Sequence, residues 1–169
     1  MSRKGKIDFI ITGALIAAAY AGLTYLCNAF GLAYGQIQLR LSEVLTILPV
    51  FTSAAIPGLT IGCFLANIGS FNAADMVFGT AATLAAAVLT YFLKDFRIKG
   101  LPILAFLPPV LVNAIVIGLE IAFFFMPEAD FFWAFVISGL QVGLGQLIVC
   151  FVFGIPFYLV VKKYRIFKK

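Results

Sequence analysis

Long runs without a charged side chain constrain this sequence more than any other feature. Residues 9–29, 76–93 and 131–161 contain no Asp, Glu, Lys or Arg, and each approaches or exceeds the ~20 apolar residues that a helix needs to cross a bilayer. Charged residues make up 11% of the sequence, whereas a soluble domain carries about 25%. No segment alternates as a membrane barrel strand would. The sequence therefore predicts an all-α integral membrane protein.

Prolines, glycines and polar clusters divide the chain into six apolar segments, which we interpret as one six-transmembrane-helix bundle over residues 1–169. The predicted helices are 9–29, 43–56, 58–70, 76–93, 101–125 and 131–161. A break at Pro57–Gly58 separates the short second and third helices, because proline lacks the amide hydrogen that continues a helix. Pro108–Pro109 is expected to kink the fifth helix.

The distribution of cations predicts the orientation of this bundle, since short cytoplasmic loops of membrane proteins collect Lys and Arg. With the N-terminus inside, the inner segments 1–7, 94–99 and 162–169 hold eleven of the twelve cations. Arg40, in a loop assigned to the outside, is the exception. Both termini are therefore predicted to be cytoplasmic, and the net charge of +5 requires no nucleic-acid partner.

The sequence lacks the residue patterns that would indicate a metal site or an enzyme. The sequence has no His, and Cys27, Cys63 and Cys150 stand alone in apolar segments without the spacing of a metal site or a disulfide. It contains no phosphate-binding loop and no nucleophile elbow. We expect no metal, no cofactor held by this chain and no enzymatic activity.

Polar side chains inside an apolar bundle mark function by default, because they are costly to place there. The run from Gly35 to Glu43 alternates polar and apolar residues, and Ser42 is expected to cap a helix whose first turn holds Glu43 at the outer mouth. Asn113 and Glu120 lie seven residues apart, so they project from nearly the same helix face. The candidate binding residues are Gln38, Arg40, Glu43, Asn67, Asp75, Asn113, Glu120 and Gln141.

Two interpretations of these polar residues remain open. They form a polar cup that opens outward and binds a small ligand with both donors and acceptors. Alternatively, amides such as those of Asn113, Gln141 and Gln146 only satisfy one another between helices.

Small residues in the first helix repeat at the spacing that lets two helix backbones approach closely. Ala14, Ala18 and Gly22 form this stripe, and Ala17 and Ala21 widen it. The stripe packs against the chain's own helices or docks on a partner membrane subunit.

The run GQIQLRLSE from Gly35 to Glu43, followed by Leu45 to Pro49 within a six-helix layout, resembles the QueT family of queuosine-precursor transporters. These are substrate-binding (S) components of energy-coupling factor (ECF) transporters. The resemblance implies a multi-pass protein of the bacterial inner membrane that binds a 7-deazaguanine such as preQ1, preQ0 or queuine. It further implies a transmembrane coupling protein, contacted through Ala14 and Ala18, and two ATPase subunits that use ATP.

A 7-deazaguanine offers an amine and ring N–H donors that a carboxylate accepts, and a carbonyl that an amide or Arg donates to. Glu43, Asp75 and Glu120 are the candidate acceptors. Three alternatives to this function stay open: an S component for another vitamin-like ligand, a stand-alone transporter that carries a proton on Glu120, and a structural membrane subunit without a ligand.

Overall fold

The computed structural model describes residues 2–31, 40–70 and 72–167, and this part of the chain is helical without a β-strand. The all-helical class is therefore confirmed. Four helical spans are long and apolar enough to cross a membrane: Arg3–Ala29, Asp75–Leu93, Ile103–Phe125 and Phe131–Tyr164. Two shorter apolar helices lie between the first and the second of these: Leu41–Val50 and Ala55–Ile68.

Three of the long spans combine different kinds of helix. The first span is a single α-helix, α1 (Arg3–Ala29). The second joins a π-helix, η2 (Asp75–Gly79), to α3 (Thr80–Leu93). The third comprises a 3₁₀ helix, η3 (Ile103–Phe106), then α4 (Leu107–Glu120) and a π-helix, η4 (Ile121–Phe125). The fourth runs through α5 (Phe131–Leu147), a π-helix, η5 (Ile148–Phe153), and α6 (Gly154–Tyr164).

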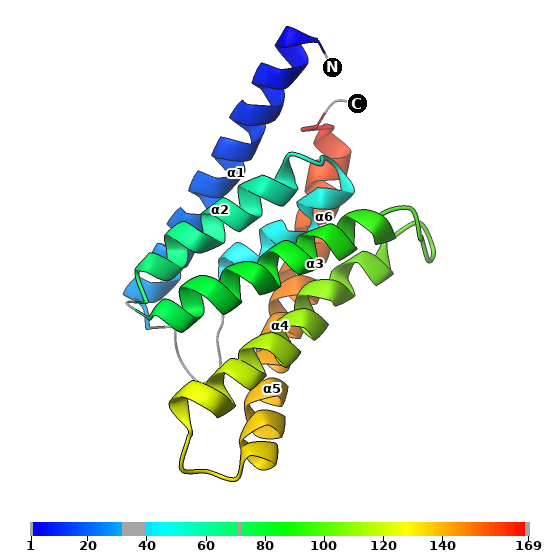
Figure 1. Ribbon diagram of the computed structural model, residues 1–169. Helices are drawn as coiled ribbons and strands as arrows, with labels where there is room; N and C mark the ends of the chain where they lie inside the picture. The colour runs from blue at the N-terminus through cyan, green and yellow to red at the C-terminus, as the bar shows by residue number, and fades with distance from the viewer. Residues whose placement is uncertain (1, 32–39, 71, 168–169) are drawn as a thin grey trace.

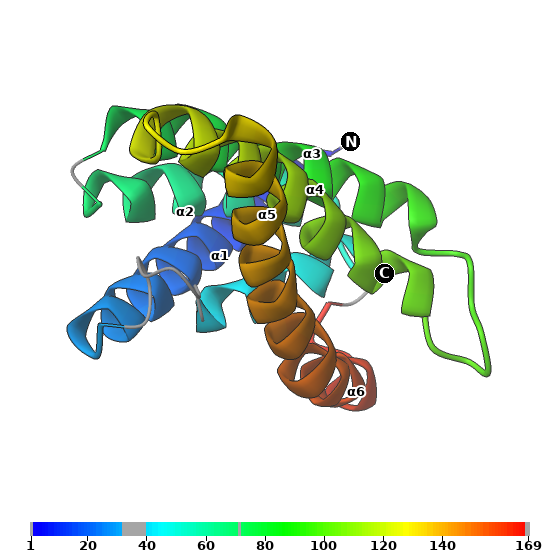
Figure 2. The same ribbon diagram turned by 90° about the horizontal axis from the view of Figure 1, so that it is seen from below.

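The helices from α1 to α5 pack in chain order, each against the next, with α2 (Ala55–Ile68) between α1 and α3. The short helix η1 (Leu41–Val50) lies behind α2 and α3 (Figure 1) and contacts α1, α3, η5 and α6. Seen from below, α5 and α6 continue as one column beside it (Figure 2). Thus η1 is the element that most of the bundle surrounds.

The sequence of η1 explains why it is a 3₁₀ helix. In an α-helix, Pro49 would clash with the carbonyl of Leu45 and leave it without a hydrogen-bond donor. With three residues per turn, side chains three apart share a face. One such face holds Glu43, Thr46 and Pro49, and all three are buried. The face that begins at Leu41 is wholly apolar, whereas Ser42 shares the third face with two leucines.

The break between the second and third helices lies before Pro57, contrary to the prediction. Helix α2 begins at Ala55 and includes both Pro57 and Gly58. The amides of a helix's first turn have no intrahelical partner, so proline is tolerated there. For the same reason Pro108–Pro109 are accommodated in the first turn of α4, where η3 joins it. The kink expected at these prolines stays a prediction.

Close approach of α1 and α2 depends on glycine. An added Cβ at Gly58 would lie 2.7 Å from the carbonyl oxygen of Gly13, and one at Gly62 would lie 2.8 Å from that of Ala17. A side chain at either position would therefore force the two helices apart.

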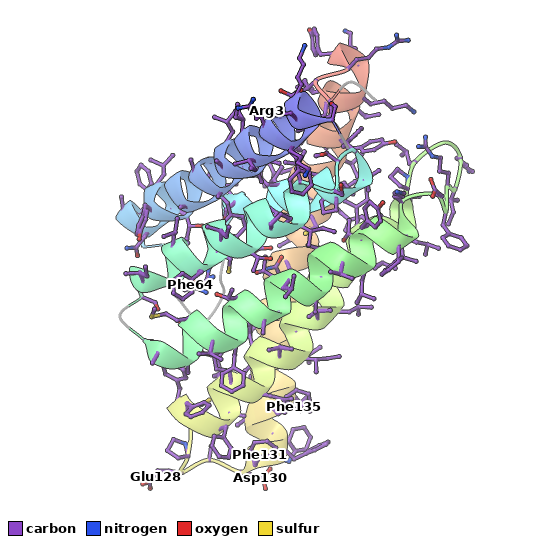
Figure 3. The ribbon with its side chains drawn as sticks, turned by 45° about the horizontal axis from the view of Figure 1, so that its top comes forward. Arg3, Phe64, Glu128, Asp130, Phe131 and Phe135 are labelled. Carbon is purple, nitrogen blue, oxygen red and sulfur yellow. The ribbon has the colours of Figure 1, made fainter. Side chains whose placement is uncertain are left out.

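The two ends of the molecule carry different charges. The N- and C-termini lie at the same end (Figure 1), near Arg3, whereas Glu128 and Asp130 lie at the opposite end (Figure 3). Between these ends many large apolar side chains of the long helices are exposed, such as Leu15, Leu111 and Leu140. Such a surface is suited to contact with lipid chains.

The contact between α1 and α2 can be tested with Gly62→Ala. The extra methyl group overpacks the interface, which costs about 1 to 3 kcal/mol and should lower Tm by roughly 3 to 10 °C for a chain of this size. Thermal unfolding in detergent measures the effect. Gly22→Ala is the matched control in α1, because a Cβ there meets nothing within 4 Å. Equal Tm values for the two variants would contradict the close approach.

Candidate functional site

The start of η1 brings two charged residues into the interior. Glu43 is 3% exposed and Arg40 is 7% exposed. The hydroxyl of Tyr20 in α1 donates a hydrogen bond to Oε1 of Glu43. The other carboxylate oxygen, Oε2, is buried without a partner among the described residues. Arg40 and Gln146 are polar neighbours of this carboxylate, so Oε2 can accept from a further donor in a polar part of the interior.

Glu43 lies deeper than the predicted outer mouth. Its partner Tyr20 stands nine residues before the end of α1 at Ala29, which corresponds to roughly 13 Å along an α-helix. Ser42 does not cap η1, since its hydroxyl instead accepts a hydrogen bond of 2.7 Å from Thr24, and the N-cap position belongs to Arg40. The helix therefore begins within the bundle, where side chains of α1 supply partners.

Asn67 holds Arg40 in place. Its Oδ1 accepts from Nη1 of Arg40 at 3.1 Å, and its Nδ2 donates to the carbonyl oxygen of Asp75 at 2.8 Å. Nδ2 also donates to Sγ of Cys63 at 3.4 Å. The side chain of Asn67 is fully buried, and both its oxygen and its nitrogen are already hydrogen-bonded within the protein. Asn67 therefore acts here as a positioning residue for Arg40.

Glu120 is the second buried carboxylate. It is 3% exposed, and both of its oxygens are buried without a hydrogen-bond partner in the described part of the chain. Asp75 is its neighbour, and the guanidinium of Arg40 attracts the carboxylates of both Glu120 and Glu43. Asn113, on the same helix, is also buried. The predicted grouping of these acids with Arg40 thus occurs within one region.

The amide nearest to Glu43 comes from Gln146 and not from Gln141. Gln146 is 5% exposed, and Sγ of Cys150 donates to its Oε1 at 3.7 Å. The same thiol lies 4.0 Å from the carbonyl oxygen of Glu43. Gln141 is only half-buried. Gln38 lies outside the described residues.

Tyr20 is missing from the sequence-based predictions, and Gln146 is named there as an amide but not among the candidate binding residues. A tyrosine within an apolar span needs a partner for its hydroxyl, and that signal points to Tyr20. Gln146 and Cys150 are four residues apart and so share a helix face. Within the part of the chain that the structure describes, no group of three metal-ligating side chains comes together.

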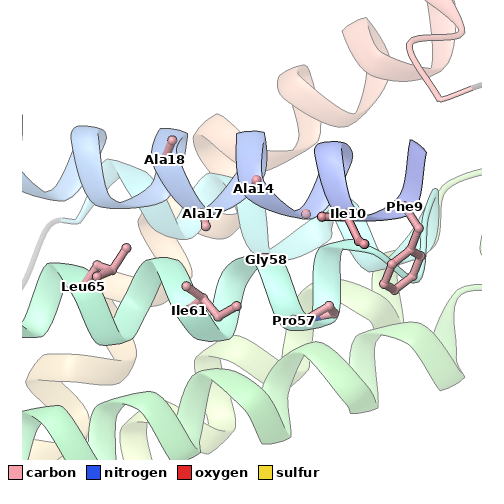
Figure 4. Close-up of a pocket in the computed structure, with 10 residues that line it drawn as sticks. Phe9, Ile10, Ala14, Ala17, Ala18, Pro57, Gly58, Ile61 and Leu65 are labelled. Carbon is pink, nitrogen blue, oxygen red and sulfur yellow. The ribbon is translucent and has the colours of Figure 1, made fainter. Parts of the chain in front are cut away.

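A second feature lies on the outer side of α1. An apolar groove of about 420 Å³ runs between α1 and α2 (Figure 4), with Ala14 and Ala18 on one wall and Ile61 and Leu65 on the other. Ala14 and Ala18 are exposed. Ala17 and Ala21 are buried, and Ala17 also lines this groove. The small residues of α1 therefore form an exposed stripe and a buried stripe that meet at the groove.

Comparison with known proteins identifies the family. A family model described as QueT transporter matches residues 10–163. The chain belongs to the QueT transporter family.

One similar protein is the queuosine precursor transporter QueT of Lactococcus lactis subsp. cremoris (strain MG1363). It is 37% identical to this chain over 93 residues, and the matched part covers 55% of each protein. The match thus spans only about half the length of that relative. No solved structure matches the chain.

Membership of the QueT transporter family settles the broad class. Family and relative are both transporters, which confirms the prediction that this chain is not an enzyme. Together with the four helices able to span a bilayer, it makes the chain a multi-pass membrane protein. The buried acids then lie within a transporter.

The hydrogen bond between Tyr20 and Glu43 yields a testable expectation. Tyr20→Phe leaves a buried carboxylate without its donor, which should cost about 1 to 3 kcal/mol. Thermal unfolding of the purified protein measures the loss. Tyr25→Phe is the control, because the hydroxyl of Tyr25 donates to the Leu65 carbonyl at 2.7 Å from an exposed position. We expect a smaller loss there, and an equal loss in both variants would contradict a special role for Tyr20.

Proposed function

We propose that this chain captures a queuosine precursor of the 7-deazaguanine class from outside the cell and passes it inward. The observation that carries this proposal is a set of buried carboxylate oxygens that have no hydrogen-bond donor among the described residues: Oε2 of Glu43 and both oxygens of Glu120. The exocyclic amine and ring N–H groups of a 7-deazaguanine are donors of the kind that such oxygens accept. The name of the Lactococcus relative supports the same class of substrate.

The charges of this region favour a ligand that carries a positive charge. Glu43 and Glu120 both interact with the guanidinium of Arg40, and Asp75 adds a third acid beside Glu120. An unbalanced buried carboxylate is costly, and a cation close to it lowers that cost. An aminomethyl cation, as on preQ1, would supply the missing charge. Arg40, Asn113 and Gln146 are the donors proposed for the carbonyl of the ligand or for water beside it.

We further propose that the chain is the S component of an ECF transporter in the inner membrane. In this arrangement a transmembrane coupling protein and two ATPase subunits supply the energy. The exposed alanines Ala14 and Ala18 line an apolar groove, and small side chains there would allow a partner helix to approach closely.

The proposed orientation has six membrane segments, with η1 and α2 completing the four long spans, and both termini in the cytoplasm. Two observations support it: the termini share one end of the molecule, and Glu128 and Asp130 lie at the other. Cations gather on the cytoplasmic side of membrane proteins, and eleven of the twelve cations belong to segments assigned to that side.

Glu120 also favours a second function, that of a stand-alone transporter coupled to protons. A buried carboxylate that lies beside another acid, and that has no hydrogen-bond donor among the described residues, is suited to carry a proton. Copurification and uptake assays distinguish these two functions. An S component should associate with a coupling protein and ATPases, and uptake of its substrate should require ATP. Uptake by the chain alone that follows a proton gradient would favour the second function.

The binding proposal predicts the effect of Glu43→Gln. The new amide can still accept from Tyr20, so Tm should hardly change, but its NH₂ group opposes the donors of the ligand. Affinity for preQ1 should fall by about ten- to a hundredfold. Titration of the purified protein by calorimetry measures it. Glu128→Gln removes the same charge from an exposed loop and should leave affinity within about threefold. Unchanged affinity in Glu43→Gln would remove Glu43 from the site.

The docking proposal predicts a different pattern for Ala14→Leu combined with Ala18→Leu. These side chains fill the groove, so copurification with the coupling protein and uptake by cells should be lost while the purified chain still binds preQ1. Ala19→Leu is the control, because Ala19 is exposed on α1 outside the groove. Loss of ligand binding together with uptake would mean that Ala14 and Ala18 serve internal packing.

A further inference from the structure

A basic pocket of about 380 Å³ lies beside the C-terminal part of α6, which Figure 1 shows near the end of the bundle that holds the N-terminus. Among the described residues its cations are Lys94, Arg97 and Lys162, and its one acid is Asp95. The remaining lining consists of Pro49, Val50, Phe51, Thr52, Ser53, Tyr91, Tyr158 and Phe167. None of these residues belongs to the region around Glu43 and Glu120, so the pocket is a separate site.

The pocket lies where the apolar helices end. The span Asp75–Leu93 stops one residue before Lys94, and Lys162 stands in the last turn of α6. In a membrane protein this level corresponds to the boundary between the hydrocarbon and the lipid headgroups. A ligand in the pocket would therefore lie at headgroup depth.

The cations of the pocket face aromatic rings. Nζ of Lys94 lies 3.7 Å from the centre of the Tyr91 ring, and Nζ of Lys162 lies 5.9 Å from that of Tyr158. A ring attracts a cation only weakly compared with a carboxylate or phosphate. Both ammonium groups thus keep most of their capacity to bind an anion.

The floor of the pocket is built from elements distant in sequence. Phe51, which follows η1, packs on Tyr158 at 5.1 Å and on Phe167 at 6.3 Å between ring centres. The chain reverses after α6 because Arg165 adopts a left-handed conformation with φ of 48°, and this brings Phe167 over Phe51. Three aromatic rings from distant parts of the chain are thus packed together in the lining of the pocket.

We propose that this pocket binds the phosphate-bearing headgroup of an anionic membrane lipid. Basic pockets between transmembrane helices are suited to such headgroups, and the hydroxyls of Thr52 and Ser53 add neutral donors. The volume of about 380 Å³ is more than tenfold the roughly 30 Å³ occupied by one water molecule, so it has room for a headgroup larger than a bare phosphate. The aromatic side chains of Phe51, Tyr158 and Phe167 suit the first methylene groups of the acyl chains.

The test uses the full chain purified in detergent and a short-chain phosphatidylglycerol as the probe. Binding is measured by native mass spectrometry and by the lipid-dependent rise in Tm. We expect phosphatidylglycerol to bind and phosphatidylcholine of the same chain length to bind at least about tenfold more weakly. Equal binding of the two lipids would overturn the proposal, and this comparison requires no variant.

A variant with Lys94→Gln, Arg97→Gln and Lys162→Gln locates the site. It should lose about tenfold or more in affinity for phosphatidylglycerol while it still binds preQ1 like the unmodified chain. Arg3→Gln, Lys4→Gln and Lys6→Gln together remove the same charge from exposed positions at the N-terminus and should change the affinity by less than about threefold. Equal losses in both variants would mean general attraction to charge and no site.

A control with inorganic phosphate tells whether the pocket binds a lipid headgroup or a free phosphate ion. Phosphate alone should neither raise Tm as the lipid does nor displace phosphatidylglycerol at millimolar concentration. If phosphate reproduces the full effect of the lipid, the pocket binds a free anion and the assignment to a lipid is wrong.

Discussion

A carboxylate buried next to a guanidinium in an apolar bundle requires partners, and the centre of this structure depends on how it supplies them. The Tyr20 hydroxyl donates to Glu43, and the Asn67 amide accepts from Arg40. These two bonds tie α1 and α2 to the start of η1. Removing one partner from a buried polar group costs far more than the net gain from making the bond. The bonds therefore fix the arrangement of three helices at once.

Some parts of this fold could be predicted from the sequence, and others could not. Uncharged runs are expensive to expose to water, so the four long helices follow from composition and length alone. The position of the break before α2 does not follow, because proline is excluded from helix interiors but accepted in the first turn. The conformation of η1 depends on Pro49 and on the helices around it. The grouping of Arg40 with Glu43 could be predicted from their spacing, but the depth of Glu43 could not, because it is set by Tyr20 on a different helix.

Helix α1 illustrates another limit of prediction from sequence. Its small residues form two stripes, one through Gly13, Ala17 and Ala21 and one through Ala14, Ala18 and Gly22. Both stripes have the same period, and a shift of one residue turns a helix face by about 100°. Only the complementary glycines of α2, Gly58 and Gly62, decide which stripe is buried. The period alone cannot distinguish an internal contact from an exposed surface.

The tight winding of η1 restricts how this segment can change in length. Ten residues extend about 20 Å as a 3₁₀ helix but only about 15 Å as an α-helix. One end is anchored where Phe51 packs on Tyr158, and the other where Glu43 meets Tyr20. Deleting one residue between these anchors would turn Glu43 by about a third of a turn, away from its donor. Substitutions within η1 can be absorbed by repacking, whereas an insertion or deletion would separate the charged residues from both neighbouring helices.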